Sequence, residues 1–189
     1  MKTWSQLFTR HGWLLEENEM GGFDCTMETE TNLEFLFEVL QQARVEYIFG
    51  NETLFIEDEP LLEEQWIKLL DFEHRGIGEG LWFRPGVDQP KIKELDTYIC
   101  GVVRQLNRLG FHTVGSCHGH GRKAPYVMVT KDRGITALLK TLELLGYKRV
   151  RARENRNSYH IALHVSRLEL LELAEKLSPI EGEWKRNQN

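Results

Sequence analysis

The fold is decided by the stretch Leu33-Glu34-Phe35-Leu36-Phe37-Glu38-Val39-Leu40, which sets apolar side chains at positions 33, 36, 37 and 40. This is the spacing of a helix with one buried face. The same spacing returns in the second half of the chain, at Ile135, Leu138, Leu139 and Leu142. Two matching patterns indicate that the chain contains a structural repeat.

Strand candidates surround the two helical patterns in the same order. In the first half they cover 13–16, 23–28, 45–49 and 53–57, and in the second half 111–117, 126–130, 149–153 and 158–165. Further helices are predicted around Trp4, Leu7 and Phe8, over 61–70, over 92–106 and over 167–177. Both halves therefore have the pattern α-β-β-α-β-β-α. This predicts an α+β protein of two related lobes, each a mostly antiparallel sheet with helices on one face.

Glycine and proline gather at 72–90, a composition typical of a linker. We therefore place an N-terminal lobe at 1–71 and a C-terminal lobe at 91–189. Residues 1–80 carry 18 acidic and 5 basic side chains, whereas 81–189 carry 11 and 19. This asymmetry predicts an anionic ligand for the basic lobe. It also supports an alternative function without catalysis, in which the acidic lobe binds a basic protein partner, unless both surfaces are simply solvated.

The composition indicates a globular protein of the cytoplasm. The N-terminus lacks the apolar core of a signal peptide, and no apolar run approaches the roughly 20 residues of a membrane-spanning helix. We therefore expect no membrane association. Cys25, Cys100 and Cys117 are odd in number and widely spaced, which argues against a disulfide framework and predicts that Cys25 and Cys100 are buried as small apolar residues.

Reactive side chains concentrate in the run Gly115-Ser116-Cys117-His118-Gly119-His120-Gly121-Arg122, which follows a strand candidate. Its glycines permit a tight turn or a close approach of the backbone to a ligand. At the equivalent place the first lobe has residues 17–22, which include neither cysteine nor histidine. The sequence therefore predicts a site in the second lobe alone.

An anion-binding face is predicted beside this run. Alternation along 158–165 sets Ser158, His160, Ala162 and His164 on the face away from the helices. A symmetric turn would place Arg151 near His160 and Arg153 near Ser158. The predicted substrate-binding residues are Ser116, Arg122, Arg149, Arg151 and Arg153, with Lys123 at the edge, and the arginines favour a phosphate-bearing ligand such as a nucleotide or RNA. Alternatively, the arginines form a solvated strand face or pair with the acidic lobe.

Three interpretations of the Cys/His run stay open. In the first, a catalytic zinc ion is held by three protein ligands drawn from Cys117, His118, His120, His160 and His164. In the second, Cys117 is a catalytic nucleophile activated by a neighbouring imidazole such as that of His120. In the third, the glycines make a turn, Cys117 is buried, and the histidines bind a ligand or contact water.

The run over residues 107–120 resembles bacterial and phage proteins that have a Ser-Cys-x-Gly-His loop after a helix and a strand. It is also similar to the wybutosine-synthesis family of tRNA-modifying methyltransferases, which has Ser-Cys-Ser-Gly-Arg there. Ser116, Cys117 and Gly119 match that pattern, while His118 and His120 stand in place of its Ser and Arg. The similarity extends over about 91–131 and implies binding of S-adenosylmethionine and methylation of tRNA.

Overall fold

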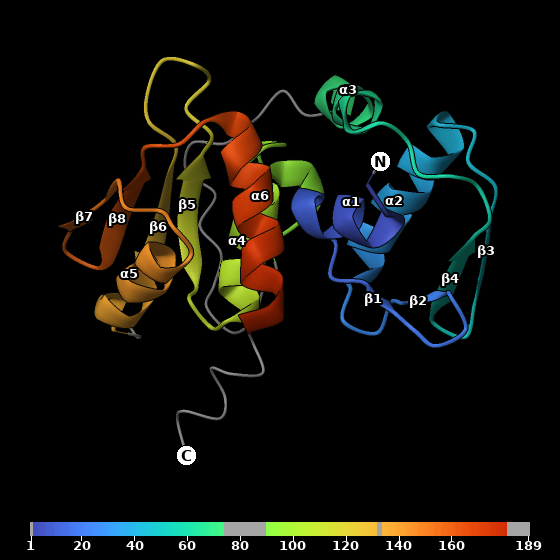
Figure 1. The fold of residues 1–189 in the computed structure, drawn as a ribbon, viewed down its shortest axis with the longest axis horizontal. Coiled ribbons are helices and arrows are strands. Elements are labelled where there is room, and N and C mark those ends of the chain that lie inside the picture. The colour runs from blue at the N-terminus through green and yellow to red at the C-terminus, as the bar shows by residue number, and fades with distance from the viewer. Residues whose placement is uncertain (1, 74–89, 132–133, 181–189) are drawn as a thin grey trace.

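A computed structural model describes residues 2–73, 90–131 and 134–180 (Figure 1). Most of the predicted linker, including Trp82, Phe83 and Arg84, lies at 74–89, outside the described residues. Within the described ranges the chain forms six α-helices and two four-stranded antiparallel sheets. The predicted α+β class with two similar lobes is therefore confirmed.

The first lobe has the predicted order of elements. These are α1 (Trp4–His11), β1 (Glu16–Glu17), β2 (Phe23–Asp24), α2 (Glu30–Gln42), β3 (Tyr47–Gly50), β4 (Thr53–Ile56) and α3 (Glu63–Glu73). The first two strands are shorter than predicted. Residues 26–28 form a turn instead of extending β2, and in this turn the Glu28 amide donates to the Cys25 carbonyl oxygen at 2.9 Å.

The second lobe repeats this order. Its elements are η1 (Ile92–Glu94), α4 (Cys100–Arg108), β5 (Thr113–Cys117), β6 (Tyr126–Thr130), α5 (Ile135–Leu144), β7 (Val150–Glu154), β8 (Ser158–Leu163), α6 (Arg167–Leu177) and η2 (Ser178–Ile180). The sheets have the strand orders β1-β2-β4-β3 and β5-β6-β8-β7, so corresponding strands occupy corresponding positions.

The two helical patterns bury one face as predicted, with a shift in α2. Leu36 and Leu40 are fully buried there, together with Phe35 and Val39, whereas Phe37 packs its ring 5.2 Å from that of Tyr47 on β3. In α5 the buried residues are Leu138 and Leu142. Each helix therefore packs its apolar face into the core, where burying a large aliphatic side chain contributes about 1.5–3 kcal/mol.

The predicted helix over 92–106 is wrong as one continuous element. A short 3-10 helix ends at Leu95 in an extended conformation, and α4 begins only at Cys100. Asp96 lies in the break, where its carbonyl oxygen accepts from the amides of Ile99 and Cys100 at 3.1 and 3.0 Å. Aspartate favours such caps over helix interiors because its carboxylate competes for backbone donors. In this chain the break directs the Asp96 side chain toward β5.

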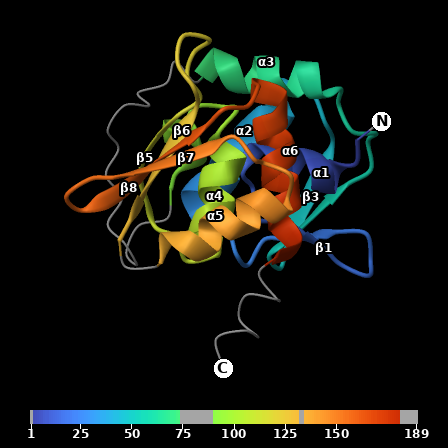
Figure 2. The same ribbon diagram turned by 60° about the vertical axis from the view of Figure 1, so that its left-hand side comes forward.

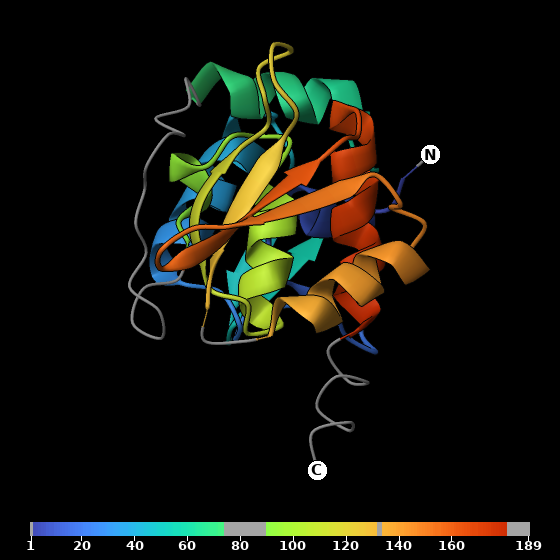
Figure 3. The ribbon, with the colours of Figure 1, turned by 90° about the vertical axis from the view of Figure 1, so that its left-hand side faces the viewer.

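The lobes pack back to back through their helices. α1, α4 and α6 lie side by side between the two sheets (Figures 1 and 2). One apolar core continues through both lobes, from Phe8 and Trp13 in the first to Ile161 and Leu163 in the second. In Figure 3 the second sheet lies in front with α4 behind its strands, so its opposite face points away from the first lobe.

A polar network also joins the lobes. Arg104 on α4 donates to both carboxylate oxygens of Glu28 at 2.7 Å and to the carbonyl oxygen of Gly12 at 3.0 Å. The Arg104 and Glu28 side chains are 1% and 0% exposed. Across the same boundary, Asn32 accepts from the Ile92 amide at 2.9 Å.

The structure bears on two expectations from the sequence, one about disulfides and one about membrane-spanning helices. No disulfide joins Cys25, Cys100 and Cys117, all of which are buried. Among the described residues, no helix combines the length and apolar character that a membrane span requires.

We predict that Gly101→Ala destabilises the chain, because Gly101 allows α4 to approach the other two central helices. A Cβ atom there would lie 2.3 Å from the Arg10 carbonyl oxygen on α1 and 2.7 Å from the Ala174 Cβ on α6. Overpacking of this kind costs about 1–3 kcal/mol. Urea denaturation measures the loss, with Gly50→Ala as control because its Cβ would meet no atom within 4 Å. Equal effects of the two substitutions would contradict the prediction.

A second prediction concerns acid stability. His11 is fully buried, and neither ring nitrogen has a hydrogen-bond partner among the described residues. Burial, together with the charges of Arg10 and Lys2, lowers the pKa of His11 from 6.5 to about 3. As the pH falls below about 6.5, His11 binds a proton in the unfolded chain but not in the folded chain. The free energy of unfolding that depends on neutral His11 is therefore lost between about pH 6.5 and pH 3.

Removing this histidine should therefore flatten the pH dependence. We expect His11→Leu to reduce the slope of the unfolding free energy against pH by up to about 1.4 kcal/mol per pH unit in that window. Denaturation at a series of pH values measures the slope. His164→Asn, at an exposed position, is the control. A slope that is the same in the wild type and in His11→Leu would rule out the assignment.

Candidate metal centre

The glycine-rich turn after β5 is held by its own backbone. The amides of Arg122 and Lys123 donate to the Gly119 carbonyl oxygen at 2.8 and 3.0 Å. Gly119, His120 and Gly121 all have left-handed φ angles, of 84°, 46° and 73°. A Cβ at Gly119 would lie only 2.1 Å from the Lys123 carbonyl oxygen, so this position requires glycine.

Asp96 approaches this turn from the break before α4. Its carboxylate is buried and accepts from the His118 amide at 3.0 Å. The same oxygen, Oδ2, lies 3.5 Å from His120 Nε2 and 3.8 Å from His118 Nδ1. Asp96 is not among the site residues predicted from the sequence, because the apolar spacing over 92–106 predicts one amphipathic helix that includes it. The signal available in the sequence was an aspartate next to the apolar face of that helix.

Asp96, Cys117 and His120 form a cluster in which one ligand atom of each residue lies within 4.8 Å of the other two. Carboxylate oxygen, thiolate sulfur and imidazole nitrogen are all zinc ligands, and catalytic zinc sites use three protein ligands with a position open to water. The Gly119 amide donates to Cys117 Sγ at 3.3 Å. The side chain of His120 is 51% exposed, so the cluster is accessible from solvent on that side.

His118 is packed beside the cluster. Its ring centroid lies 4.3 Å from that of His120, and it meets the Tyr98 ring edge-on at 5.5 Å. The Arg167 guanidinium lies over the Tyr98 ring, 5.1 Å from its centroid. His118 is therefore a buried imidazole beside the cluster of Asp96, Cys117 and His120, and it is not part of that cluster.

The second sheet has two rows of paired residues on the face that carries Cys117. One row runs Cys117, Tyr126, Ala162 and Arg151 across β5, β6, β8 and β7, and the other runs Gly115, Met128, His160 and Arg153. With strands about 4.8 Å apart, a row spans roughly 14 Å. The rings of Tyr126 and His160 stack at 4.6 Å in the middle of this face.

The predicted hairpin register is wrong by two residues. Arg153, and not Arg151, pairs with His160, while Arg151 pairs with Ala162. The cause is the position of the turn, since the Asn155 amide donates to the Ser158 carbonyl oxygen at 2.8 Å and centres the turn on Arg156 and Asn157. The two arginines nevertheless share the face of Cys117, and both are exposed. No ion pair links either one to a carboxylate in the part of the chain that the structure describes.

The other predicted site residues are spread around the lobe. Ser116 is buried and pairs with Val127, so it lies on the opposite face of β5 from Cys117. Arg122 is exposed in the turn. His160 stacks on Tyr126, and His164 lies beyond the end of β8 beside Arg149, whose carbonyl oxygen accepts from the His164 amide at 3.1 Å. Of the five predicted metal ligands, the structure thus brings Cys117 and His120 together with Asp96.

The two remaining cysteines have the properties of structural thiols. Burial raises the pKa of Cys25 to about 11 and that of Cys100 to about 12. Because a thiolate is the nucleophile and metal ligand, neither thiol is reactive near neutral pH. The prediction that both are buried small residues is confirmed.

Comparison with known proteins adds no assignment to this geometry. No protein-family model matches the chain, and a search of curated proteins also returns no match.

We predict that His120→Gly makes the metal-free chain more stable. A left-handed conformation costs an ordinary residue about 1–2 kcal/mol, and glycine adopts it without that penalty but loses more chain entropy on folding. The expected gain is about 0.5–1 kcal/mol, measured by urea denaturation in the presence of a chelator. The same substitution at His164, which lacks a positive φ, is the control. A loss of stability in His120→Gly would contradict this interpretation of the turn.

Proposed function

We propose that the second lobe is a metal-dependent hydrolase that acts on a phosphate-bearing ligand, a nucleotide or RNA. The observation that supports the metal is the convergence of Asp96, Cys117 and His120, whose ligand atoms lie within 4.8 Å of one another. Zinc is the ion that this donor set favours, because it accepts sulfur, nitrogen and oxygen ligands together. Strained backbone at a ligand-bearing residue, here His120, is typical of functional sites.

Each residue near the cluster has a role in this proposal. When bound, the metal would polarise a phosphoryl oxygen and make a bound water acidic at neutral pH. We assign His118 to accept the proton of that water, since its ring contacts His120 and its Nδ1 lies 3.8 Å from Asp96, which would stabilise the protonated imidazole. The water oxygen would bond to phosphorus as the ester bond breaks, and the leaving oxygen would take the proton that His118 had accepted.

The sheet face beside the cluster supports a phosphate-bearing ligand. Cys117 and Arg151 end the same row, roughly 14 Å apart across four strands. Between them, the stacked rings of Tyr126 and His160 offer an aromatic surface on which a base can stack. Arg151 and Arg153 are exposed at the far end, where guanidinium groups hold phosphate oxygens. The resemblance of the turn to tRNA-modifying methyltransferases makes S-adenosylmethionine a second ligand to test.

We predict about one zinc ion per chain in purified, tag-free protein, measured by plasma mass spectrometry. Cys117→Ala and His120→Ala should each remove the metal while the chain stays folded. Cys25→Ala and His164→Ala remove the same residue types elsewhere and should retain it. Metal-free protein in repeated preparations, or equal loss in the control variants, would overturn the metal assignment.

A cysteine nucleophile is the second candidate, favoured by the Gly119 amide that donates to Cys117 Sγ at 3.3 Å. Such a donor stabilises a thiolate. If the protein is metal-free and iodoacetamide labels Cys117 rapidly at neutral pH, this candidate replaces the hydrolase. An inert Cys117 in metal-free protein excludes both.

The alternative from a different class is a binding protein that uses the first lobe. A cavity of about 420 Å³ there has Phe37 and Phe49 among its lining residues, together with exposed carboxylates of Glu30, Glu34 and Glu52. Aromatic faces and carboxylates together suit a cationic side chain of a basic partner. Partner binding that is unchanged in Cys117→Ala, with no turnover lost, would favour this alternative.

A further inference from the structure

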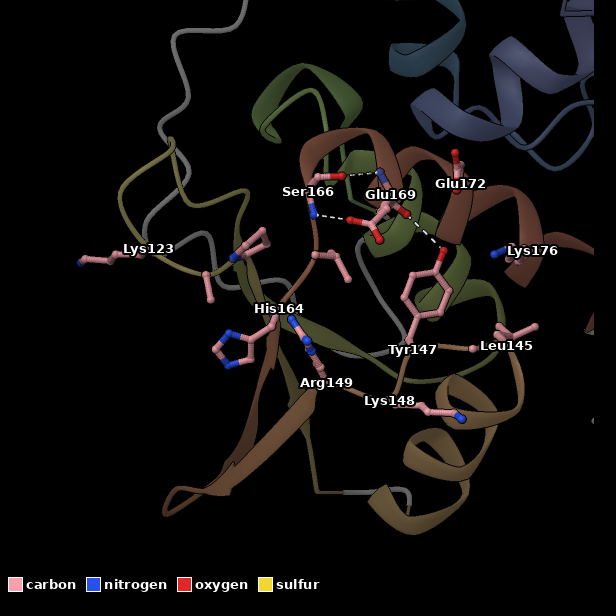
Figure 4. Close-up of a pocket in the computed structure, with 14 residues that line it drawn as sticks. Lys123, Leu145, Tyr147, Lys148, Arg149, His164, Ser166, Glu169, Glu172 and Lys176 are labelled. Atoms are coloured by element: carbon pink, nitrogen blue, oxygen red, sulfur yellow. Dashed lines mark hydrogen bonds between the residues drawn. The ribbon is translucent and has the colours of Figure 1, made fainter.

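A second candidate site is a cavity at the same end of the second sheet as Cys117, beyond the row of Cys117, Tyr126, Ala162 and Arg151. Its volume is about 730 Å³, within the range of small-molecule sites. It lies where the end of α5, the residues before β7, the end of β8 and the start of α6 meet. Lys123 of the glycine-rich turn is also a lining residue, and its side chain is directed away from the others in Figure 4. None of the three clustered residues, Asp96, Cys117 and His120, lines it.

Positive charge exceeds negative charge around this cavity. The basic side chains are Lys123, Lys148, Arg149, His164 and Lys176, and the acidic ones are Glu169 and Glu172. Lys123, Lys148 and Arg149 are exposed, and no ion pair joins them to a carboxylate within the described residues. A concave surface with an excess of one sign of charge raises the local concentration of the opposite ion.

One of the two carboxylates, that of Glu169, takes part in the capping box of α6. Glu169 accepts from the Ser166 amide at 2.7 Å, while the Glu169 amide donates to the Ser166 hydroxyl oxygen at 3.2 Å. Hydrogen bonding of its carboxylate to the Ser166 amide, and to the Ser166 hydroxyl, lowers the pKa of Glu169. Because this capping box satisfies the first turn of α6, an anion in the cavity would be held by side chains and not by free helix amides.

The backbone around the cavity holds the cations in place. The amides of His164 and Leu163 donate to the carbonyl oxygens of Arg149 and Pro125 at 3.1 and 2.7 Å. Beneath them Tyr147 is buried and donates its hydroxyl to the Glu169 carbonyl oxygen at 3.2 Å (Figure 4). The chain segments that carry the basic side chains are therefore fixed relative to one another before any ligand binds, which reduces the entropic cost of binding.

We propose that this cavity is a second binding site, specific for the phosphate groups of a small molecule of nucleotide size. Lys148 and Arg149 contribute cationic side chains from adjacent positions, and His164 is the imidazole of the lining. The site is separate from the proposed hydrolase centre, and it divides the predicted arginine row: Arg149 belongs to the cavity, whereas Arg151 and Arg153 belong to the sheet face.

Isothermal titration with sodium pyrophosphate, on chelator-treated protein, tests the proposal. Wild-type protein should bind, and Lys148→Glu and Arg149→Glu should each weaken binding by about tenfold or more, since a charge-assisted hydrogen bond contributes about 1.5–3 kcal/mol. Lys140→Glu makes the same charge change at an exposed position on α5 outside the cavity and should leave affinity nearly unchanged. Citrate should bind more weakly than pyrophosphate.

The outcomes separate this site from the metal centre. Cys117→Ala should bind pyrophosphate like the wild type, whether or not the hydrolase proposal holds. Loss of binding in Cys117→Ala but not in Lys148→Glu would place pyrophosphate at the metal centre and overturn the cavity site. No binding by the wild type, equal weakening by Lys140→Glu, or citrate binding as tight as pyrophosphate would also overturn it.

Discussion

The pair of Arg104 and Glu28 is the interaction on which the arrangement of the two lobes depends. Both side chains are almost fully buried, and a buried charge without its partner costs several kcal/mol. The lobes therefore cannot separate, or slide far past each other, without exposing or stranding a charge. Replacing the pair with apolar residues can leave stability unchanged in other proteins, so its role here is to define one relative position of the lobes. That position holds α4 against Gly12 and Glu28 of the first lobe.

The two lobes share one topology but differ in what their equivalent loops carry. Each sheet has the same strand order, and each lies outside a shared layer of helices. In the first lobe the connection between its first two strands is closed by Asn18, whose side-chain oxygen accepts from Gly22 and whose carbonyl oxygen accepts from Gly21. In the second lobe the equivalent connection carries Cys117 and His120. The two lobes thus share a scaffold, and they differ in the side chains that this connection carries.

Much of the fold could be predicted from the sequence because it follows from local periodicity. The helical spacing at Leu36 and Leu138 and the exact bounds of α6 come from residues that are near in sequence. Asp96 could not be recognised as part of the site, because its role depends on a contact with the turn after β5, 22 residues further along the chain. The pairing of Arg153 with His160 was missed for a related reason. A shift of the turn by one residue changes the register of the whole hairpin, and several turns suit the sequence around Arg156.

The position of β7 at the edge of the second sheet gives its arginines a further consequence. An edge strand presents unpaired backbone groups that can pair with a strand of another molecule, and charged side chains are a common protection against such aggregation. Arg151 and Arg153 alternate along this edge and repel a second copy of themselves. Loss of these charges would therefore leave an edge strand that other chains can pair with. This protection of the edge acts even when no ligand is present.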